Sequence, residues 1–256
     1  MKLSATVVAQ DEADRISPCI ESVRTFCDEI LVVDGGSGDA TREIAARLGA
    51  RVLRRPFDDF AQQHEFARTE ASGEWILSID ADERASPELA AAVEAALRGT
   101  ASAYALPFRN HFRGVWLRHG GLWPDRHVRL FRKARCRYDP NRPVHEKLLV
   151  EGAIEQLDAS IIHETWTSLE QCLAKMERYG ERAAQVLFAQ GRRAGAWEIA
   201  FRPLWRFLRG YVLRAGFLDG AAGAVVAWAR AYEAYVRYAR LWELSRFAAS
   251  RGDALR

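Results

Sequence analysis

Two aspartates and a glutamate follow one short apolar run closely enough to act on the same ligand. The apolar residues 75–79 lead directly into Asp80-Ala81-Asp82-Glu83. Magnesium and manganese ions prefer oxygen ligands, and Mg²⁺ typically takes one or two protein carboxylates together with phosphate oxygens of its substrate. The pattern therefore predicts a metal and diphosphate site. The alternative is a solvated acidic turn before the next helix, which is what most isolated Asp-x-Asp sequences form.

Another carboxylate, Asp34, stands at the end of a second apolar run and is followed by Gly35-Gly36-Ser37-Gly38-Asp39. These glycines permit positive φ and a close approach of the backbone to a ligand, and the carboxylate can accept hydrogen bonds from a nucleoside. The spacing matches neither the dinucleotide fingerprint G-x-G-x-x-G nor the P-loop. We expect a nucleoside-binding turn, with an ordinary strand-to-helix turn as the alternative.

The segment 118–126 combines glycine, aromatic surface and charge within nine residues. Gly120 and Gly121 would let the backbone approach a ligand, and Trp123 would offer a face for stacking on a sugar. This composition predicts a substrate loop. The alternative is a bulged hairpin turn with the tryptophan in the core.

Two later residues have side chains suited to acid–base or metal chemistry. Glu146 lies beside His145 in the segment 142–147, and a buried carboxylate with a perturbed pKa can serve as a general base. His163 follows Ile161 and Ile162, and imidazole is a good ligand for Mn²⁺. Both interpretations stay open, because His-Glu pairs are common in surface turns and buried histidines usually bond to the backbone.

Alternating strand and helix patterns position these groups. Apolar runs predict strands over residues 3–9, 29–34, 51–53 and 75–79. Helical spacing predicts helices over residues 16–23, 41–48, 60–71 and 89–97. The alternation indicates an α/β fold with a mostly parallel sheet and helices on its faces. Ligands of such sheets bind at the carboxyl ends of strands, where Asp11-Glu12, Asp34 and Asp80-Ala81-Asp82 are expected to converge.

The second half of the chain has a different pattern. Residues 102–165 are irregular and rich in Arg, Gly, His and Trp, which is typical of an antiparallel or loop-built half that covers the crevice. From Leu169 to the end the spacing is helical almost throughout. We therefore predict a catalytic domain over residues 1–168 and a helical, basic, amphipathic region over residues 169–256.

Composition limits the class of protein. The chain has 256 residues, with 49% hydrophobic and 28% charged, as expected for one globular domain with an appendage. The four cysteines show no metal-binding spacing, which favours reduced thiols. No run of about 18 residues is apolar and uncharged, and the N-terminus shows no signal-peptide pattern. We expect a cytoplasmic protein.

The C-terminal region is basic and aromatic. Twelve arginines and five acidic residues from Arg192 onward give it a net charge of +7, so the remainder carries −4 of the total +3. One face of the predicted helix carries Phe201, Leu204, Trp205, Leu208, Tyr211 and Val212. Arg202, Arg206 and Arg209 lie along another face. This separation of apolar and basic faces predicts peripheral contact with an anionic membrane. The alternative is that the apolar face packs on the catalytic domain or on a second copy of the chain. A nucleic-acid partner is disfavoured, because no groove-reading motif is present.

Together, several segments resemble a known family. The segments 7–12, 32–41 and 75–83 resemble family 2 glycosyltransferases of the GT-A fold. The lipopolysaccharide core β-1,4-glucosyltransferase group is similar to this chain in the segments 119–125, 129–132, 144–147, 162–163 and 210–220. The resemblance covers nearly the whole chain. It departs at Gln10-Asp11-Glu12, where the family usually has Asn-Glu-Glu, and this places the detailed contacts of that turn in doubt.

The resemblance implies inverting transfer of a hexose, glucose first, from a UDP-sugar to a saccharide or lipid-linked saccharide acceptor. It assigns the uridine to Asp34 and the turn from Ala9 to Glu12, and the ribose or donor sugar to Asp80. It assigns a Mg²⁺ or Mn²⁺ ion to Asp82 and His163, and the catalytic base to Glu146. Gly120, Gly121 and Asp125 are further donor-binding candidates, with Asp125 the reserve base.

Two alternatives remain from the residues themselves. A nucleotidyltransferase would be expected to carry a glycine-rich, basic triphosphate loop after its first strand, whereas Gln10-Asp11-Glu12 is acidic. A catalytically silent saccharide-binding protein or scaffold would not need Asp80, Asp82, Glu146 and His163 together.

Overall fold

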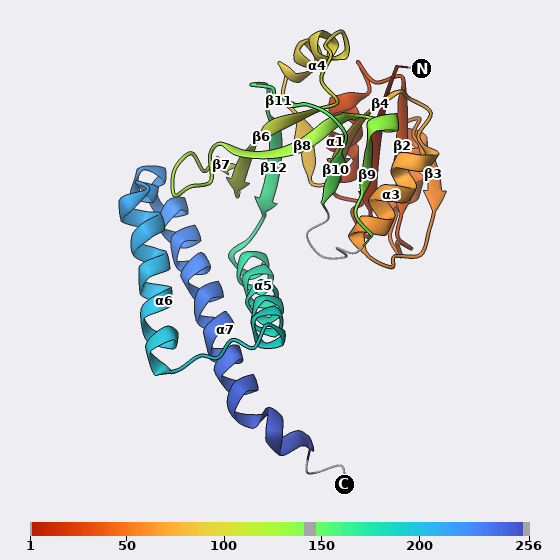
Figure 1. Cartoon of the computed structure of the whole chain (residues 1–256). Coiled ribbons are helices and arrows are strands. Elements are labelled where there is room, and N and C mark those ends of the chain that lie inside the picture. The colour runs from red at the N-terminus through yellow and green to blue at the C-terminus, as the bar shows by residue number, and fades with distance from the viewer. Residues whose placement is uncertain (1, 141–146, 253–256) are drawn as a thin grey trace. The chain divides into compact units, whose positions relative to one another are not determined.

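The computed structural model describes residues 2–140 and 147–252 and divides into two compact units (Figure 1). We call Met1–Arg109 with Pro124–His163 the α/β unit, and Asn110–Trp123 with Glu164–Arg256 the helical unit. The helical unit thus also contains the segment Asn110–Trp123, which precedes its helices in the sequence. The functional boundary after residue 168 stays a prediction.

The first unit alternates strands with helices before the chain turns to mostly strands. The strands of the chain, of which β7 lies in the helical unit, are β1 (Leu3–Ala9), β2 (Glu29–Asp34), β3 (Arg51–Arg54), β4 (Trp75–Asp80), β5 (Glu83–Ala85), β6 (Ala103–Phe112), β7 (Val115–Trp116), β8 (Asp125–Arg132), β9 (Cys136–Tyr138), β10 (Leu148–Val150), β11 (Ile154–Gln156) and β12 (Ile161–Trp166). The helices before residue 100 are α1 (Ile16–Val23), α2 (Thr41–Arg47), α3 (Phe60–Glu70) and α4 (Leu89–Leu97), and a short 3₁₀ turn, η1, spans Lys133–Arg135.

The main sheet has the strand order β3-β2-β1-β4-β8-β6-β12-β5. Strands β1 to β4 pair in parallel, and β8 joins them antiparallel to β4. This confirms the predicted α/β class with a mostly parallel first half. Each of the first four strands and helices coincides with its predicted range to within one residue.

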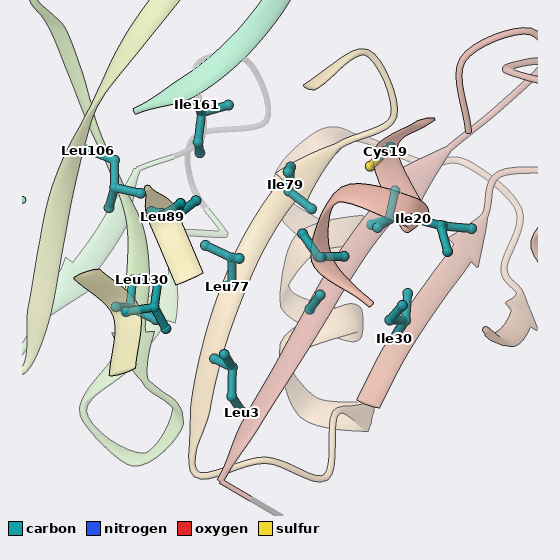
Figure 2. Close-up of a cluster of buried hydrophobic side chains, with 14 of the residues drawn as sticks. Leu3, Cys19, Ile20, Ile30, Leu77, Ile79, Leu89, Leu106, Leu130 and Ile161 are labelled. Carbon is teal, nitrogen blue, oxygen red and sulfur yellow. The ribbon is translucent and has the colours of Figure 1, made fainter. Parts of the chain in front are cut away.

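Both faces of the parallel half are covered, as the continuous apolar runs require. Ile30 and Val32 of β2 belong to a core cluster that also contains Ile20 of α1 and Leu89 of α4. Figure 2 shows side chains from β1, β4 and these helices gathered in that cluster. The alternate residues of β2, Leu31 and Val33, pack instead with α3 and the β9–β10 hairpin. Successive β2 side chains therefore bury themselves in opposite layers.

The second half of the sheet is more regular than the sequence pattern predicts. Strand β6 has ten residues and β8 has eight, and the two pair antiparallel with a register shift at Tyr104/Ala105. Polar residues interrupt both strands, and Pro107 lies within β6. Of the two predicted forms, an antiparallel or a loop-built half, the antiparallel form is confirmed in β6 and β8, and the prediction that this segment is irregular is wrong for these two strands.

The helical unit consists of α5 (Leu169–Ala189), α6 (Ala196–Leu208), a π turn η2 (Arg209–Leu213), a 3₁₀ turn η3 (Gly216–Asp219) and α7 (Gly220–Gly252). Helix α7 lies between α5 and α6 (Figure 1). In the core of the helical unit, Val226 and Ala229 of α7 pack with Cys172 and Met176 of α5. No single helix in the described part of the chain is long and apolar enough to span a membrane. The segments Ala196–Leu213 and Gly216–Phe247, bent by 73°, meet that test of length and composition only as a pair.

All four cysteines are free thiols. Burial, with Asp28 nearby, raises the pKa of Cys27 to about 12. Burial also raises the pKa of Cys136 and of Cys172 to about 11. These thiols stay protonated and unreactive near neutral pH, in agreement with the expectation of reduced cysteines.

Candidate functional site

The parallel strands bring the predicted acidic residues to one edge of the sheet. In the register of the sheet, Ala9 of β1 lies opposite Asp34 of β2, and Val8 lies opposite Asp80 of β4. The carboxyl ends of three neighbouring strands therefore meet at the same level. This confirms the predicted convergence at the edge where α/β proteins bind ligands.

Reciprocal hydrogen bonds hold the turn after β1 against the turn after β2. Asp11 has a positive φ of 55°, and its carboxylate accepts from the Gly38 amide at 2.8 Å. The Asp11 amide in turn donates to Ser37 Oγ at 2.9 Å. The Glu12 amide donates to Thr41 Oγ1 at 2.8 Å. The first turn is thus fixed by its polar neighbours although it departs from the family's usual Asn-Glu-Glu.

Asp34 is completely buried at the end of β2. Its carboxylate accepts hydrogen bonds from the amides of Gly36 and Ser37 at 3.1 to 3.2 Å, and Arg42 Nη1 lies 3.3 Å away. The glycine-rich turn therefore curls around this carboxylate. The geometry holds the side chain in one place at the strand end, and its contact with a nucleoside stays a prediction.

Asp80 and Glu83 share one guanidinium. Arg129 of β8 donates to Asp80 at 2.7 Å and to Glu83 at 2.6 Å, and Glu83 is 1% exposed. Burial opposes ionisation of Asp80, but the positive charges of Arg129 and His64 outweigh it and hold the pKa of Asp80 below its usual range. Burial and the two neighbouring aspartates raise the pKa of Glu83 well above its usual range. Arg129 therefore keeps Asp80 ionised inside a crowded acidic cluster.

Replacing Arg129 by Gln is expected to lower the free energy of unfolding by about 3 kcal/mol at pH 7, because buried carboxylates lose their counter-charge. The value is at the low end because the Asp80 side chain is 35% exposed. The stabilisation from ionised Asp80 is complete above its pKa in the unfolded chain, about 3.9, and is lost as the pH falls from there toward its lower pKa in the folded protein, so the difference between the two proteins should shrink over this range. The pKa of Glu83 is raised, so its ionisation has the opposite effect on stability and costs free energy as the pH rises. Glu83 can therefore take up a proton in the Arg129→Gln variant, and this limits the loss of stability.

Urea denaturation at pH 7 and pH 3.5 measures this difference. The matched control is Arg98→Gln, which removes an exposed i,i+4 ion pair with Glu94 and should change the stability by less than about 0.5 kcal/mol. Equal losses in the two variants, or a loss that grows as the pH falls, would contradict the assignment of Arg129.

Asp82, Glu83 and His163 form a cluster with the chemistry of a divalent-metal site. Their ligand atoms all lie within 4.8 Å of one another, and His163 Nε2 is 3.4 Å from Asp82 Oδ2. Strand β12 pairs antiparallel with β5, which places His163 directly opposite Glu83. Carboxylate oxygens with one imidazole suit Mn²⁺ and, through the oxygens, Mg²⁺. The residues present therefore fit the predicted ion, and they add Glu83 to the predicted pair.

Glu12 adds to the negative potential of this site. Its carboxylate lies 2.8 Å from Arg15 Nε, and Arg15 Nη1 lies 4.0 Å from Asp82. Burial raises the pKa of Glu12, Arg15 opposes that rise, and Asp82, Asp39 and Asp80 reinforce it. The carboxylates repel one another strongly enough to favour a cation or a proton among them.

Asp125, at the start of β8, belongs to the α/β unit but not to the metal cluster. Its side chain is 48% exposed and lies 3.2 Å from His127 Nε2. The rings of His127 and His163 both pack edge-on against Phe108, with centroid distances of 5.0 and 5.9 Å. A series of contacts through His127 and Phe108 thus connects Asp125 with His163. The other candidate base, Glu146, lies outside the described residues.

Gly120 and Gly121 lie in the helical unit, where they meet the chain around residue 214. Both have positive φ, 67° and 76°. The Gly120 amide donates to the Arg214 carbonyl at 2.9 Å, and a Cβ on Gly121 would lie 2.1 Å from Arg214 Nη1. His119 Nδ1 lies 2.7 Å from Asp219. These contacts join the 119–125 segment to the 210–220 segment, and the donor-binding role of the two glycines stays a prediction.

Sequence reasoning missed Arg129, His64 and Arg15 as parts of the site. Arg129 stands between Val128 and the buried residues Leu130 and Phe131 of β8, and a charged residue among apolar neighbours is a signal for a buried ion pair. His64 is 4% exposed and stacks on Tyr138, and its Nε2 lies 3.8 Å from Asp80. Nothing in its helical context marked it. His64 and Arg129 pair with Asp80, and Arg15 lies near Asp82, only because the tertiary fold brings these distant segments together.

Comparisons with known proteins place the chain among glycosyltransferases. The model of the family "Glycosyl transferase family 2" matches residues 4–149. An uncharacterized glycosyltransferase of Rickettsia typhi is 30% identical over 95% of this chain and 88% of its own length. The lipopolysaccharide core biosynthesis glycosyltransferase LpsC of Rhizobium meliloti is 29% identical over 93% of this chain and 94% of its own. Among solved structures, residues 1–349 of S. aureus TarS align with a TM-score of 0.48 at 15% identity, covering 97% of this chain and 92% of that one.

Proposed function

Because the chain belongs to glycosyl transferase family 2, we propose that it transfers a hexose, glucose first, from a UDP-sugar to a saccharide hydroxyl with inversion at the anomeric carbon. The observation that supports this most is the cluster of Asp82, Glu83 and His163 beside Asp80 at the carboxyl edge of the parallel sheet. The likeness to LpsC supports a role in lipopolysaccharide core or related cell-envelope glycan synthesis.

The donor nucleotide would lie along the turns after β1 and β2. In this proposal Asp34 and the turn from Ala9 to Glu12 hold the uridine, and Asp80 faces the ribose or the donor sugar. Support comes from the fixed position of the Asp34 carboxylate and from Arg129, which keeps Asp80 ionised and therefore able to accept hydroxyl hydrogen bonds. Gly120, Gly121 and Asp125 remain proposed donor contacts.

The metal would be a Mg²⁺ or Mn²⁺ ion held by Asp82 and His163, with Glu83 adjacent. Such an ion neutralises the charge that develops on the leaving diphosphate. The chain's own contribution is to hold the ligand set: Arg15 lies 4.0 Å from Asp82, and the pairing of β12 with β5 fixes His163 opposite Glu83. The repulsion among the carboxylates favours loading of the site.

The acceptor hydroxyl needs a base. We assign Glu146, which would take the hydroxyl proton as the oxygen forms its bond to the anomeric carbon and the bond from that carbon to the diphosphate oxygen breaks. The glycosidic bond then has inverted configuration and UDP leaves. The assignment rests on the family resemblance of the segment 144–147, with Asp125 as the reserve base.

The acceptor would be a saccharide or a lipid-linked saccharide, reached by peripheral contact of the helical unit with the inner face of the cytoplasmic membrane. Support comes from α6, whose apolar side chains Trp197, Leu204 and Trp205 are 65%, 58% and 52% exposed. Exposed aromatics beside arginines suit an anionic interface. A second copy of the chain is the alternative partner for this face.

Release of the nucleoside diphosphate from a panel of nucleotide-sugars tests the proposal. We expect release with UDP-glucose or another UDP-hexose in the presence of Mn²⁺, stimulated by a saccharide acceptor, and little release from GDP- or ADP-sugars. Release of pyrophosphate from UTP and a sugar phosphate would favour a nucleotidyltransferase instead. A folded protein that binds saccharide and turns over none of these donors would favour the silent binding protein.

A further inference from the structure

A pocket lies within the helical unit and is lined by arginines. Its hollow, about 470 Å³ with its open mouth included, is formed by α6, η2, η3, α7 and the segment around His119. Arg206, Arg209, Arg214 and Arg230 all line it. Four guanidinium groups around one hollow are unusual because like charges repel at close range.

The acidic residue of this pocket is already engaged. Asp219 is the one carboxylate among the described lining residues, and its side chain is 4% exposed. It accepts from the amides of Arg118 and His119 at 3.2 and 2.8 Å, and it lies 2.7 Å from His119 Nδ1. Asp219 therefore stabilises the wall of the pocket and leaves the arginines with excess positive charge.

Arg206 shows the effect of this excess most clearly. Its Nε is buried and has no hydrogen-bond partner within residues 2–140 and 147–252. Burial lowers the pKa of Arg206, and the charges of Arg237, Arg209 and Arg214 lower it further, while Glu233 opposes them. Glu233 is in turn paired with Arg237. A buried guanidinium nitrogen without a partner costs free energy unless a ligand supplies an acceptor.

The pocket is built on closely packed glycine backbone. A Cβ on Gly223 would lie 2.0 Å from the Gly216 carbonyl oxygen, and one on Gly216 would lie 2.8 Å from the Gly210 carbonyl oxygen. Arg230 Nη1 donates to the Gly120 carbonyl at 3.2 Å. These contacts leave little room for the backbone walls to move apart, so the backbone that carries the arginines is in place before any ligand arrives.

Exposed apolar residues alternate in sequence with the pocket residues. Leu208, Val212 and Leu213 flank Arg209 and Arg214 and are 43%, 48% and 62% exposed. Phe217 and Leu218, between the lining residues Gly216 and Asp219, are 49% and 61% exposed. Side chains of this kind enter the boundary between headgroups and acyl chains, where a phosphate lies at the same depth.

We propose that this pocket binds the phosphate group of a membrane lipid, with the arginines on the phosphate oxygens and the surrounding apolar side chains in the lipid interface. Guanidinium groups match phosphate bidentately, and a buried donor such as Arg206 Nε gains an acceptor. The apolar residues favour a lipid over a free anion. The inference rests on the membrane contact proposed above for the helical unit and does not depend on Asp34, Asp80 or Asp82 in the α/β unit.

Vesicle binding by the full-length chain tests this site. Co-sedimentation is measured with phosphatidylcholine vesicles and with the same vesicles containing about 20 mol% phosphatidic acid or phosphatidylserine. We expect at least about tenfold tighter binding to phosphatidic acid vesicles than to phosphatidylcholine, and Arg206→Gln/Arg209→Gln should remove most of that gain. The control Arg178→Gln/Arg182→Gln removes two exposed charges from α5, beyond α7, and should cost less than about twofold.

A second variant distinguishes loss of lipid binding from loss of the folded structure. Leu213→Ser/Leu218→Ser changes two side chains that are more than 60% exposed, so the fold should persist while binding to phosphatidic acid vesicles falls. Equal losses in the two arginine double variants would overturn the proposal in favour of bulk charge. Binding of inorganic phosphate without any preference for phosphatidic acid vesicles would overturn the lipid assignment. Loss of vesicle binding with unchanged UDP release separates this site from the proposed transfer reaction.

Discussion

Asp82→Ala is expected to lower turnover at least about a thousandfold and to abolish metal-dependent binding of UDP. Asp82 Oδ2 lies 3.4 Å from His163 Nε2 within the three-residue cluster. Removal of its carboxylate leaves a buried glutamate of elevated pKa and one imidazole, a poor ligand set for a hard divalent ion. Steady-state turnover at saturating donor, with calorimetric titration of UDP in the presence and absence of Mn²⁺, measures both effects.

The matched control for Asp82 is Asp14→Ala, which removes an exposed carboxylate from the loop after β1. This control should retain turnover within about threefold, because an exposed charge contributes little at this range. A turnover number for Asp82→Ala close to that of the wild type would exclude a catalytic metal ion at Asp82, Glu83 and His163. Equal losses of turnover in Asp82→Ala and Asp14→Ala would mean that the total negative charge at this edge of the sheet matters, and not a metal bound by Asp82.

Glu146→Gln should lower turnover by a factor of about 10² to 10⁴, the usual contribution of a general base, and leave UDP binding intact. The amide keeps the size of the side chain but cannot accept the acceptor proton. Because the base acts on the acceptor, the effect should appear in kcat and not in the affinity for the donor nucleotide. Initial rates at saturating donor and acceptor, with UDP titrations of both proteins, separate these quantities.

Glu151→Gln serves as the control for Glu146, since it changes an exposed glutamate five residues away in the chain. Its turnover should match the wild type within about twofold. Normal turnover in Glu146→Gln, together with a large loss in Asp125→Asn, would transfer the role of base to Asp125.

The parallel half of the fold was predictable because its strands are buried on both faces. Such strands have buried, mostly apolar runs, as residues 3–9 and 30–33 do, and their helices carry a single buried stripe. Strands β6 and β8 were not recognised, because Pro107 and alternating Arg and His residues interrupt their apolar pattern. Those polar residues have tertiary partners, such as Asp80 for Arg129, that local sequence does not reveal.

The candidate site was predictable to the extent that it follows strand ends. Asp34, Asp80 and Asp82 stand directly after apolar runs, so the parallel topology alone places them at one edge. The apposition of His163 and Glu83 depends on the antiparallel pairing of β12 with β5, which joins residues 80 positions apart in the chain. The arginine pocket required the whole helical unit, because its lining residues come from α6, η2, η3, α7 and the segment around His119, which no local pattern connects.

Calorimetric titration of UDP into the purified protein, with and without Mn²⁺ and beside GDP and ATP controls, tests the central claim most directly. The claim is that the edge formed by Asp34, Asp80 and the Asp82 cluster is a UDP-sugar site completed by a divalent ion. We predict UDP-selective binding that requires Mn²⁺. A folded protein that binds no UDP under either condition, or that binds GDP and ATP equally well, would contradict it.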